Sequence, residues 1–341
     1  MARRLSEVAR RVGVSQATVS RVLNGKPGVS DATRQAVLTA VDVLGYERPT
    51  QLRGVRARLV GLVLPELQNP IFPALAEVAG GALVQLGFTP VLCTRTAGGL
   101  TEAEYVSMLL DQQVSGVIFC GGMSAEDYDA LLRRDVPVVL LNAAIDHSGP
   151  RTGPTAGFPQ VSTDDVSAVQ QAYAHLTALG HTRIGLMVGP AHHTPSRRKA
   201  AAFRALTGSP TGGSPGAPTT HPVGHAMFSF EGGQAVAAEL LTHDITALIC
   251  GSDVLALGAT RAARRKGLTV PADLSVIGYD DSAFMNYTDP PLTTLRQPIE
   301  AMSRAAVALL VNQITGESST PSEFLHAPEL VVRNSTSPVR G

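Results

Sequence analysis

The side chains with the most evident chemistry near the N-terminus belong to residues 15–24, SQATVSRVLN. Gln16, Ala17 and Arg21 offer an amide, a methyl group and a guanidinium. These groups match the edges of adenine, thymine and guanine in the major groove of DNA. Small polar side chains at Ser15, Thr18 and Asn24 suit contacts with phosphates. The segment therefore carries the groups that reading a DNA duplex requires.

Apolar spacing predicts three short helices that would hold this segment in place. A stripe at helical spacing covers residues 5–12 and predicts the first helix. Gly13 suits the left-handed turn at a helix end, and Ser15 suits the N-cap of a second helix over residues 16–23. A third helix follows Ser30 and ends at Gly45. Two helices joined by a tight turn, with a third packed on them, form the helix-turn-helix pattern.

The charge of the chain is divided unevenly along its length. The net charge is zero, but residues 1–58 hold 11 Lys and Arg against four Asp and Glu, a surplus of +7 that the remaining residues balance with −7. A basic head on an acidic body favours a polyanionic partner for the head. The alternatives are a solvated basic surface or a three-helix module that binds protein, and the positive balance argues against the latter.

The segment LSEVARRVGVSQATVSRVLNGKPGVSDATRQAVLTAVDVLGY closely resembles the N-terminal headpiece of the lactose-repressor (LacI/GalR) family. The resemblance implies that Gln16, Ala17 and Arg21 read bases. It implies that another set of side chains positions the DNA backbone, namely Ser15, Thr18, Ser20 and Asn24. Arg4 departs from the pattern, because the family usually has Thr or Ser there as a helix cap.

Residues 47–58 form a basic linker whose role has two interpretations. In the family this region folds on DNA and wedges a leucine into the minor groove, a known way to kink DNA. The present segment is shorter and lacks the motif, and Gly54 disfavours a helix. Leu52 or Val55 could act as the wedge, with Arg53 beside them. The alternative is a flexible linker that touches phosphates through Arg48, Arg53, Arg56 and Arg58.

From Leu59 onward, short apolar runs alternate with helical patterns. This alternation predicts βαβ units and parallel sheets. About ten strands are too many for one compact half, so we predict two doubly wound α/β lobes. The expected boundaries are 1–46 for the headpiece, 47–58 for the linker and 59–338 for the body, with lobe 1 at about 59–160 and 291–318 and lobe 2 at about 161–290 and 319–338.

The body lacks the sequence signatures of common enzymes. It has no Gly-rich phosphate loop, no Gly-x-Ser-x-Gly elbow and no His-Glu-x-x-His motif. We therefore expect no enzyme activity, no cofactor and no metal site. The three cysteines, Cys93, Cys120 and Cys250, have no metal-ligand or disulfide spacing, and no apolar run reaches the length of a membrane helix. The N-terminus lacks the apolar core of a secretory signal, so a cytoplasmic setting is expected.

The body also resembles the family's effector domain, which is related to periplasmic sugar-binding proteins. The segments that carry this likeness include PELQNPIFPALAEV and CGSDVLALGATRAARRKGLTVPADLSVIGYDDS. The resemblance implies an effector pocket formed by Phe72, Asn142, Arg198, Lys199, Phe228, Ser252 and Asp280. Lys199 stands where the family usually has Arg, with Arg198 beside it as a possible substitute, and Ser252 stands where many relatives have Asn. We expect Asp253 to cap the helix that begins at Val254.

These features together predict a DNA-binding transcriptional regulator that acts as a repressor. A homodimer would bind a pseudo-palindromic operator, and a small effector, by resemblance a sugar, would control it. A nucleobase effector is the alternative within the same class. A ligand-binding α/β protein that does not bind DNA is the alternative outside it.

Overall fold

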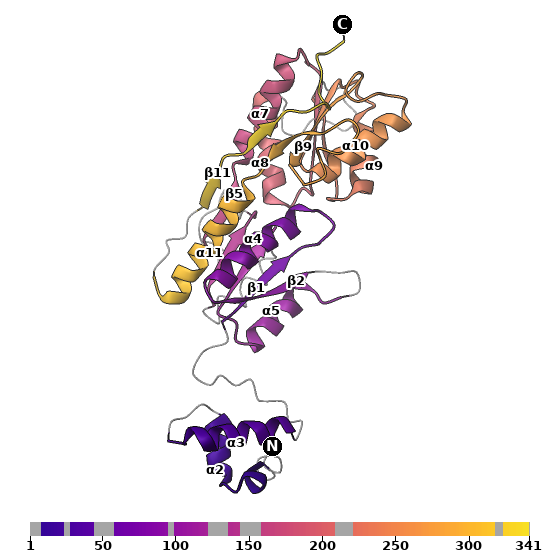
Figure 1. Cartoon of the computed structure of the whole chain (residues 1–341). Helices are drawn as coiled ribbons and strands as arrows, with labels where there is room; N and C mark the ends of the chain where they lie inside the picture. The colour runs from indigo at the N-terminus through magenta and orange to yellow at the C-terminus, as the bar shows by residue number, and fades with distance from the viewer. Residues whose placement is uncertain are drawn as a thin grey trace. The chain divides into compact units, whose positions relative to one another are not determined.

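The computed structural model describes residues 8–23, 28–43, 58–94, 99–121, 136–143, 158–208, 221–317 and 323–340. The chain forms two compact units, Met1–Arg58 and Leu59–Gly341, and Figure 1 shows the fold of each. Among the helices of the described residues, none is both long and apolar enough to cross a membrane. All three cysteines are free and buried.

The N-terminal unit is a small helical module built on local signals. Residues 8–12 are helical, Gly13 takes a φ of +74°, and α2 (Gln16–Leu23) and α3 (Asp31–Val43) follow. Equivalent serines begin the two later helices: the Ser15 hydroxyl accepts the Thr18 amide at 3.1 Å, and the Ser30 hydroxyl accepts the Thr33 amide at 3.3 Å. The core is formed by Val8, Ala9, Val19, Val22, Val37 and Ala40. The predicted helix-turn-helix is thus confirmed.

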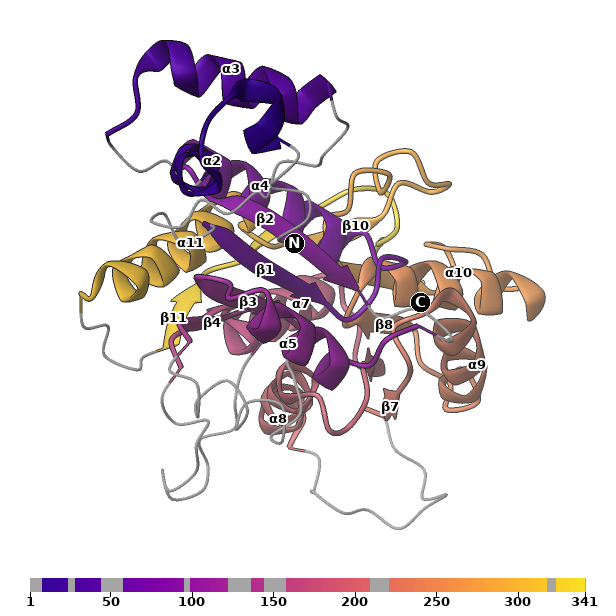
Figure 2. The same ribbon diagram turned by 90° about the horizontal axis from the view of Figure 1, so that it is seen from below.

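The first sheet of the larger unit has six strands in the order β11-β5-β4-β3-β1-β2. Its strands are β1 (Leu59–Leu64), β2 (Thr89–Thr94), β3 (Gly116–Cys120), β4 (Val138–Leu141), β5 (Gln160–Thr163) and β11 (Glu323–His326), and all these pairings are parallel. Helices α4 (Ile71–Gln85) and α11 (Ile299–Thr315) cover one face, and α5 (Glu102–Asp111) covers the other (Figure 2). Apolar side chains therefore alternate between two cores, as a doubly wound sheet requires.

The second sheet also has six strands, in the order β12-β10-β9-β8-β6-β7. Its strands are β6 (Ile184–Val188), β7 (Val223–His225), β8 (Ala247–Cys250), β9 (Ser275–Asp280), β10 (Thr293–Arg296) and β12 (Glu329–Val331), and only β12 is antiparallel to its neighbour. Helices α7 (Asp165–Ala178) and α8 (Thr194–Thr207) pack on one face, and α9 (Phe230–Leu240) and α10 (Asp253–Arg265) on the other. The predicted pair of α/β lobes is confirmed.

The chain passes between the two sheets in a different place from the predicted lobe boundaries. Strand β5 ends the first run of sheet 1 at Thr163, and α7 then packs on sheet 2. Strand β10 lies in sheet 2, although residues 291–318 were expected in lobe 1, and α11 returns to sheet 1. Strand β11 lies in sheet 1, although residues 319–338 were expected in lobe 2. Strand partners are set by long-range pairing, which the alternation of apolar runs does not encode.

Candidate DNA interface and effector site

The outer face of α2 carries the side chains that the sequence predicts to read bases. Gln16, Ala17 and Arg21 are exposed, whereas Val19 and Val22 are buried in the headpiece core. Val19 and Val22 lie three residues apart, and this spacing puts them on the inner side of the helix. Within this unit, the polar face of α2 is therefore exposed and accessible to a groove of DNA.

The polar residues around that face differ in what they do within the headpiece. Ser15 acts as the predicted helix cap, and its hydroxyl also lies 2.9 Å from that of Thr18. Thr18 and Ser20 are half-buried beside the exposed face. The other predicted DNA-binding residues, Asn24, Leu52, Arg53 and Val55, lie outside the described residues.

The predicted effector residues are distributed over both lobes and several elements. Asn142 directly follows β4, Asp280 ends β9 and Ser252 follows β8, so all three lie at carboxyl ends of parallel strands. Ligands of open α/β sheets bind beyond these ends. Asn142 and Asp280 also have positive φ values of +51° and +115°. Asn and Asp adopt positive φ more readily than other non-glycine residues, and Gln113, Asp244 and Asp281 share it, so this conformation alone does not mark a site.

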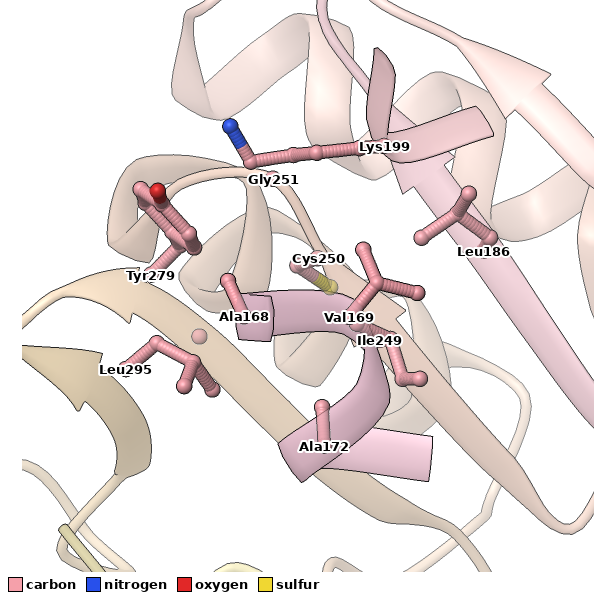
Figure 3. A pocket seen from close by; sticks show the side chains of 11 residues that line it. Ala168, Val169, Ala172, Leu186, Lys199, Ile249, Cys250, Gly251, Tyr279 and Leu295 are labelled. Carbon is pink, nitrogen blue, oxygen red and sulfur yellow. The ribbon is translucent and has the colours of Figure 1, made fainter. Parts of the chain in front are cut away.

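Lys199, on α8, is buried and forms an ion pair with Asp165 at the start of α7. Its ammonium also lies 4.1 Å from the centre of the Tyr279 ring, toward which the side chain extends in Figure 3. The Tyr279 hydroxyl donates to the same carboxylate oxygen of Asp165 at 3.3 Å. Burial raises the pKa of Asp165, and Lys199 opposes that rise. Because unpaired buried charges are costly, the two groups stabilise each other's burial.

A small apolar cavity of about 10 Å³ lies beneath Lys199. Its wall includes Ala168, Cys250, Gly251 and Tyr279 (Figure 3). A cavity of this size has room for about one water molecule, so it is too small for a sugar. It belongs to the packing of the lobe beneath the candidate site.

Asp280 connects the two lobes through a short hydrogen-bonded network. The Gln297 amide donates to Oδ1 of Asp280 at 2.6 Å, and the Thr163 hydroxyl donates to the Gln297 carbonyl oxygen at 2.6 Å. Thr163 ends β5 in sheet 1 and Asp280 ends β9 in sheet 2. Oδ2 of Asp280 is buried and has no hydrogen-bond partner among the described residues. Burial raises the pKa of Asp280, and the Asp253 carboxyl adds to the rise.

Arg198 is held by a carboxylate of the other lobe. Its guanidinium forms a bidentate ion pair with Glu323 of β11, with Nη2 and Oε2 2.9 Å apart. Arg198 lies on α8, which packs on sheet 2, whereas β11 belongs to sheet 1. Bidentate pairs of this kind have a defined geometry. Arg198 is therefore a bridge between lobes in this structure.

The start of α10 corrects one prediction. Ser252, not Asp253, is the N-cap: its hydroxyl accepts the Leu255 amide at 3.2 Å. Asp253 is the first residue of the helix, and its carboxylate accepts the Thr294 hydroxyl at 2.6 Å and the Ser282 amide at 2.7 Å. Burial raises the pKa of Asp253 to about 6. The prediction was wrong because the cap preference of Asp and Ser is nearly equal and tertiary partners decide between them.

The two predicted aromatic walls have different surroundings. Phe72 is buried in the core of lobe 1, and its ring lies so close to Gly121 that a side chain there would press on it. Phe228 is half-buried, and the His193 ring stands edge-on to it at 5.3 Å. Burial lowers the pKa of His193 to about 3, and the positive charge of Lys199 adds to this effect. A neutral imidazole beside a phenyl ring presents a largely apolar surface.

Sequence reasoning missed Asp165, Gln297, Glu323 and His193. Asp165 follows β5, whose residues QVST are mostly polar, so no apolar run marked the end of that strand in the sequence. Gln297 and Glu323 carried no readable signal either, since each functions through a residue more than 16 positions away in the chain. Within the described residues no group of three or more His, Cys, Asp or Glu side chains is placed to hold a metal ion.

Known protein families match segments of both units. Residues 4–49 match the model of bacterial regulatory proteins of the lacI family, and residues 173–336 match a periplasmic binding protein-like domain. The chain is 49% identical to HTH-type transcriptional regulator reg1 of Streptomyces lividans, over 100% of this chain and 99% of that protein. It is 48% identical to HTH-type transcriptional regulator MalR of Streptomyces coelicolor, over 100% and 98%.

Solved structures are similar to this chain over nearly its whole length. A complex of transcriptional regulator CelR with cellobiose superposes with a TM-score of 0.71 at 32% identity, covering 97% of this chain and 99% of that one. The lac repressor dimer bound to operator and the anti-inducer ONPF gives 0.73 at 28% identity, covering 97% and 98%. With relatives this close along its full length, the chain belongs to the lacI family of DNA-binding transcriptional regulators.

Proposed function

We propose that the protein is a repressor that binds a pseudo-palindromic operator as a homodimer and that a sugar bound between its lobes controls this binding. The observation that carries the proposal is the exposed face of α2, where Gln16, Ala17 and Arg21 stand on a buried apolar core. An exposed guanidinium and amide near the N-terminus of such a helix suit bases in the major groove. The proposal assigns no reaction, cofactor or metal to the chain, and it places the protein in the cytoplasm with the DNA.

The dimer is supported by the lac repressor structure named above and by an exposed aromatic pair. Phe284 and Tyr287, in the loop between β9 and β10, are 70% and 82% exposed. Large aromatic side chains are enriched in protein interfaces, so we propose this loop as part of the dimer surface. Two headpieces on a twofold dimer would read two half-sites, which explains the expected symmetry of the operator.

The sugar effector is supported by the polar groups at the strand ends and by the titles of two related structures. One relative binds cellobiose, and a lacI-family regulator from Enterococcus faecium was solved with ribose. In this chain, Asp280 has an unsatisfied buried oxygen among the described residues. The residues at 163, 280 and 297 link the two sheets, so a ligand bound there would favour one lobe arrangement and shift the population of DNA-binding states.

The test begins with selection of an operator from genomic fragments by the full-length protein. The selected fragment is then titrated by fluorescence anisotropy at several salt concentrations, with and without a panel of sugars. We expect tight binding to a two-half-site sequence, a much weaker salt-sensitive affinity for scrambled DNA, and a shift in operator affinity with at least one sugar. Equal affinity for selected and scrambled DNA would contradict the regulator proposal.

A nucleobase effector is kept as the alternative. Phe228 and His193 form a mainly apolar aromatic pair, which would also accept a purine or pyrimidine face. Adenosine, guanine and hypoxanthine therefore belong in the same panel. An operator response to one of them, and to no sugar, would favour this alternative.

A further inference from the structure

We infer that the ion pair between Arg198 and Glu323 is a latch between the two lobes. The two side chains are positioning residues that hold the lobes in the arrangement described above and limit how freely the lobes rotate. The latch itself follows from contacts within the body. Its consequence for regulation rests on the proposed function, in which a change of lobe arrangement carries the effector signal to the headpiece.

The hinge between the lobes is formed by the three places where the chain crosses from one sheet to the other, after β5, β10 and β11. Hydrogen bonds join these crossings. The Asp164 amide donates to the His326 carbonyl oxygen at 2.8 Å, which joins the first crossing to the third. The Thr163 hydroxyl donates to Gln297 at 2.6 Å, which joins the first crossing to the second. The crossings therefore form one hinge about which the lobes can turn.

The pair of Arg198 and Glu323 lies away from this hinge. Glu323 is the first residue of β11 and His326 is the last, so about 10 Å of strand separates the pair from the third crossing. A lobe rotation of about 15° around an axis across this strand would move Glu323 by about 2–3 Å relative to α8. A pair held at 2.9 Å is lost in such a movement, because hydrogen bonds fail beyond about 3.5 Å.

Both ends of the pair are held firmly by their own lobe. On the side of Arg198, the next residue of α8, Lys199, is buried and paired with Asp165, and Phe203 packs in the core of lobe 2. On the other side, β11 pairs with β5 along its whole length, beginning at Glu323. A rotation of either lobe is therefore transmitted to the pair.

The two ion pairs of α8 are suited to different tasks. Lys199 and Asp165 are 8% and 4% exposed, and both belong to helices that pack on sheet 2, so their pair does not resist a rotation between lobes. Arg198 and Glu323 are 28% and 18% exposed and come from different lobes. Water reaches this second pair, so it can break and re-form without leaving a charge buried. Its bidentate contact gives the closed latch a defined geometry.

The test measures the distance between the lobes in the full-length protein. Nitroxide labels are attached to Asp111→Cys at the end of α5 in lobe 1 and to Thr242→Cys after α9 in lobe 2, two exposed positions. The three native cysteines are buried, so the labels react at the introduced ones. Labelled chains are diluted into unlabelled chains so that a dimer carries labels in one subunit, and double electron–electron resonance gives the distance distribution.

Glu323→Gln is the first variant, because Arg198 also acts electrostatically on Asp165. Gln keeps the size of the side chain and removes its charge, so we expect a broader distribution of distances between the lobes. The matched control is Glu300→Gln, which breaks an ion pair with Arg304 inside α11 and should leave the distribution as in the wild type. Calorimetric unfolding checks that both variants are folded. An unchanged distribution in folded Glu323→Gln would overturn the inference.

A second variant tests whether the two residues act as a pair. Arg198→Gln should broaden the distribution as Glu323→Gln does, and adding Glu323→Gln to it should have no further effect. Additive effects of the two substitutions would show that the residues act separately, which would overturn the latch.

Salt separates a latch from a contact that only stabilises the fold. The pair is partly exposed, and the screening length falls to about 3 Å in 1 M salt. Raising the salt to that level should broaden the wild-type distribution, whereas Glu323→Gln should respond much less. An equal response in the two proteins would contradict an electrostatic latch.

The consequence for regulation is measured separately, by anisotropy of the selected operator with cellobiose and ribose as the first probes. Both single variants should change the sugar concentration at half response by at least about threefold, in the same direction. If the lobes loosen and no sugar changes operator binding, the sugar-effector proposal fails and the latch stands. If the lobes loosen and the response to a sugar is unchanged, the pair does not set regulation and that part of the inference fails.

Discussion

The two candidate sites of this protein are built on opposite physical plans. In the headpiece, the groups proposed to read DNA are exposed on one face of a single helix, within the six residues from Gln16 to Arg21. In the body, Asp165, Lys199 and Asp280 are buried and come from elements up to 115 residues apart. The first site depends on local helix geometry and the second on the pairing of distant strands.

This difference determines what each site responds to. An exposed cationic face is governed by salt and by the sequence of the DNA that it meets. A buried polar cluster is governed by desolvation, so every charge within it needs a partner. Perturbation of the headpiece should therefore change affinity for DNA directly, whereas perturbation of the body should change the response to a ligand or to pH.

The largest expected effect is on the exposed site. Arg21→Ala removes the proposed guanine contact and should reduce affinity for the selected operator by about 1–3 kcal/mol per half-site, which abolishes specific binding in a dimer. Residual affinity should be the same for scrambled DNA and should decline steeply with salt. The matched control is Arg10→Ala, which also removes an exposed charge, from the first helix, and should weaken binding to all sequences alike. Unchanged operator affinity in Arg21→Ala would refute the assignment of α2.

The next effect separates the two sites. Asp280→Ala should preserve specific operator binding by the ligand-free protein, with at most a small change in affinity from the lost contact with Gln297, and should raise the effector concentration needed for a response by about tenfold or more. Anisotropy titrations of the operator against the identified effector measure both quantities. Glu300→Ala is the control, because this carboxylate is 73% exposed. A normal effector response in the Asp280 variant would remove Asp280 from the pocket.

A third prediction concerns pH and the buried site. The folded-state pKa of His193, about 3, lies below the unfolded value of about 6.5. The neutral imidazole therefore makes its full contribution to the free energy of unfolding above pH 6.5, and this contribution decreases as the pH falls below 6.5. Between pH 7.5 and 5 the loss should be about 2 kcal/mol.

Urea unfolding of the wild type and of His193→Gln at the two pH values measures that loss. The variant should lose about 2 kcal/mol less of its unfolding free energy on acidification. The pKa of Asp253 is raised to about 6, so this group stabilises the folded protein more as the pH falls. Both proteins share that effect, and the difference between their losses of unfolding free energy is therefore the quantity to compare. An equal acid loss in both proteins would show that His193 is accessible to protons in the folded state.

The smallest effect returns to the headpiece. Ser15→Ala removes the cap of α2 and should destabilise it by about 1 kcal/mol. Faster amide exchange at Val19 and Val22 would report this, with operator affinity lowered only in proportion. Ser30→Ala removes the equivalent cap of α3 and should not accelerate exchange in α2 to the same degree. Unchanged exchange in Ser15→Ala would mean that packing alone holds the helix.

The sequence predicts the headpiece closely because its signals are local. Ser15, Gly13 and the apolar spacing of Val19 and Val22 each determine a feature within one or two helical turns. The two α/β lobes were also predictable, since apolar runs and helical patterns alternate. The lobe to which β10 and β11 belong could not be predicted, because the sequence of a strand four residues long does not indicate which sheet it will join.

The effector site remains a prediction, and the structure shows which partners its residues have. Asp280, Lys199 and Arg198 were identified as pocket residues, but Asp165 and Glu323, which pair with the two cations, were not. Residue type indicates that a charge will need a partner once buried. It does not indicate which of 28 acidic residues the fold will bring to it.

The chain crosses between the two sheets three times, after β5, β10 and β11. These crossings limit which parts can be exchanged between related proteins. The headpiece is one uninterrupted stretch that a single splice near Arg58 would exchange, so operator preference is portable. Neither lobe is continuous, and grafting one onto another regulator needs several simultaneous junctions. Ligand preference in this architecture should therefore diverge by point substitution, while operator preference can also change by wholesale exchange.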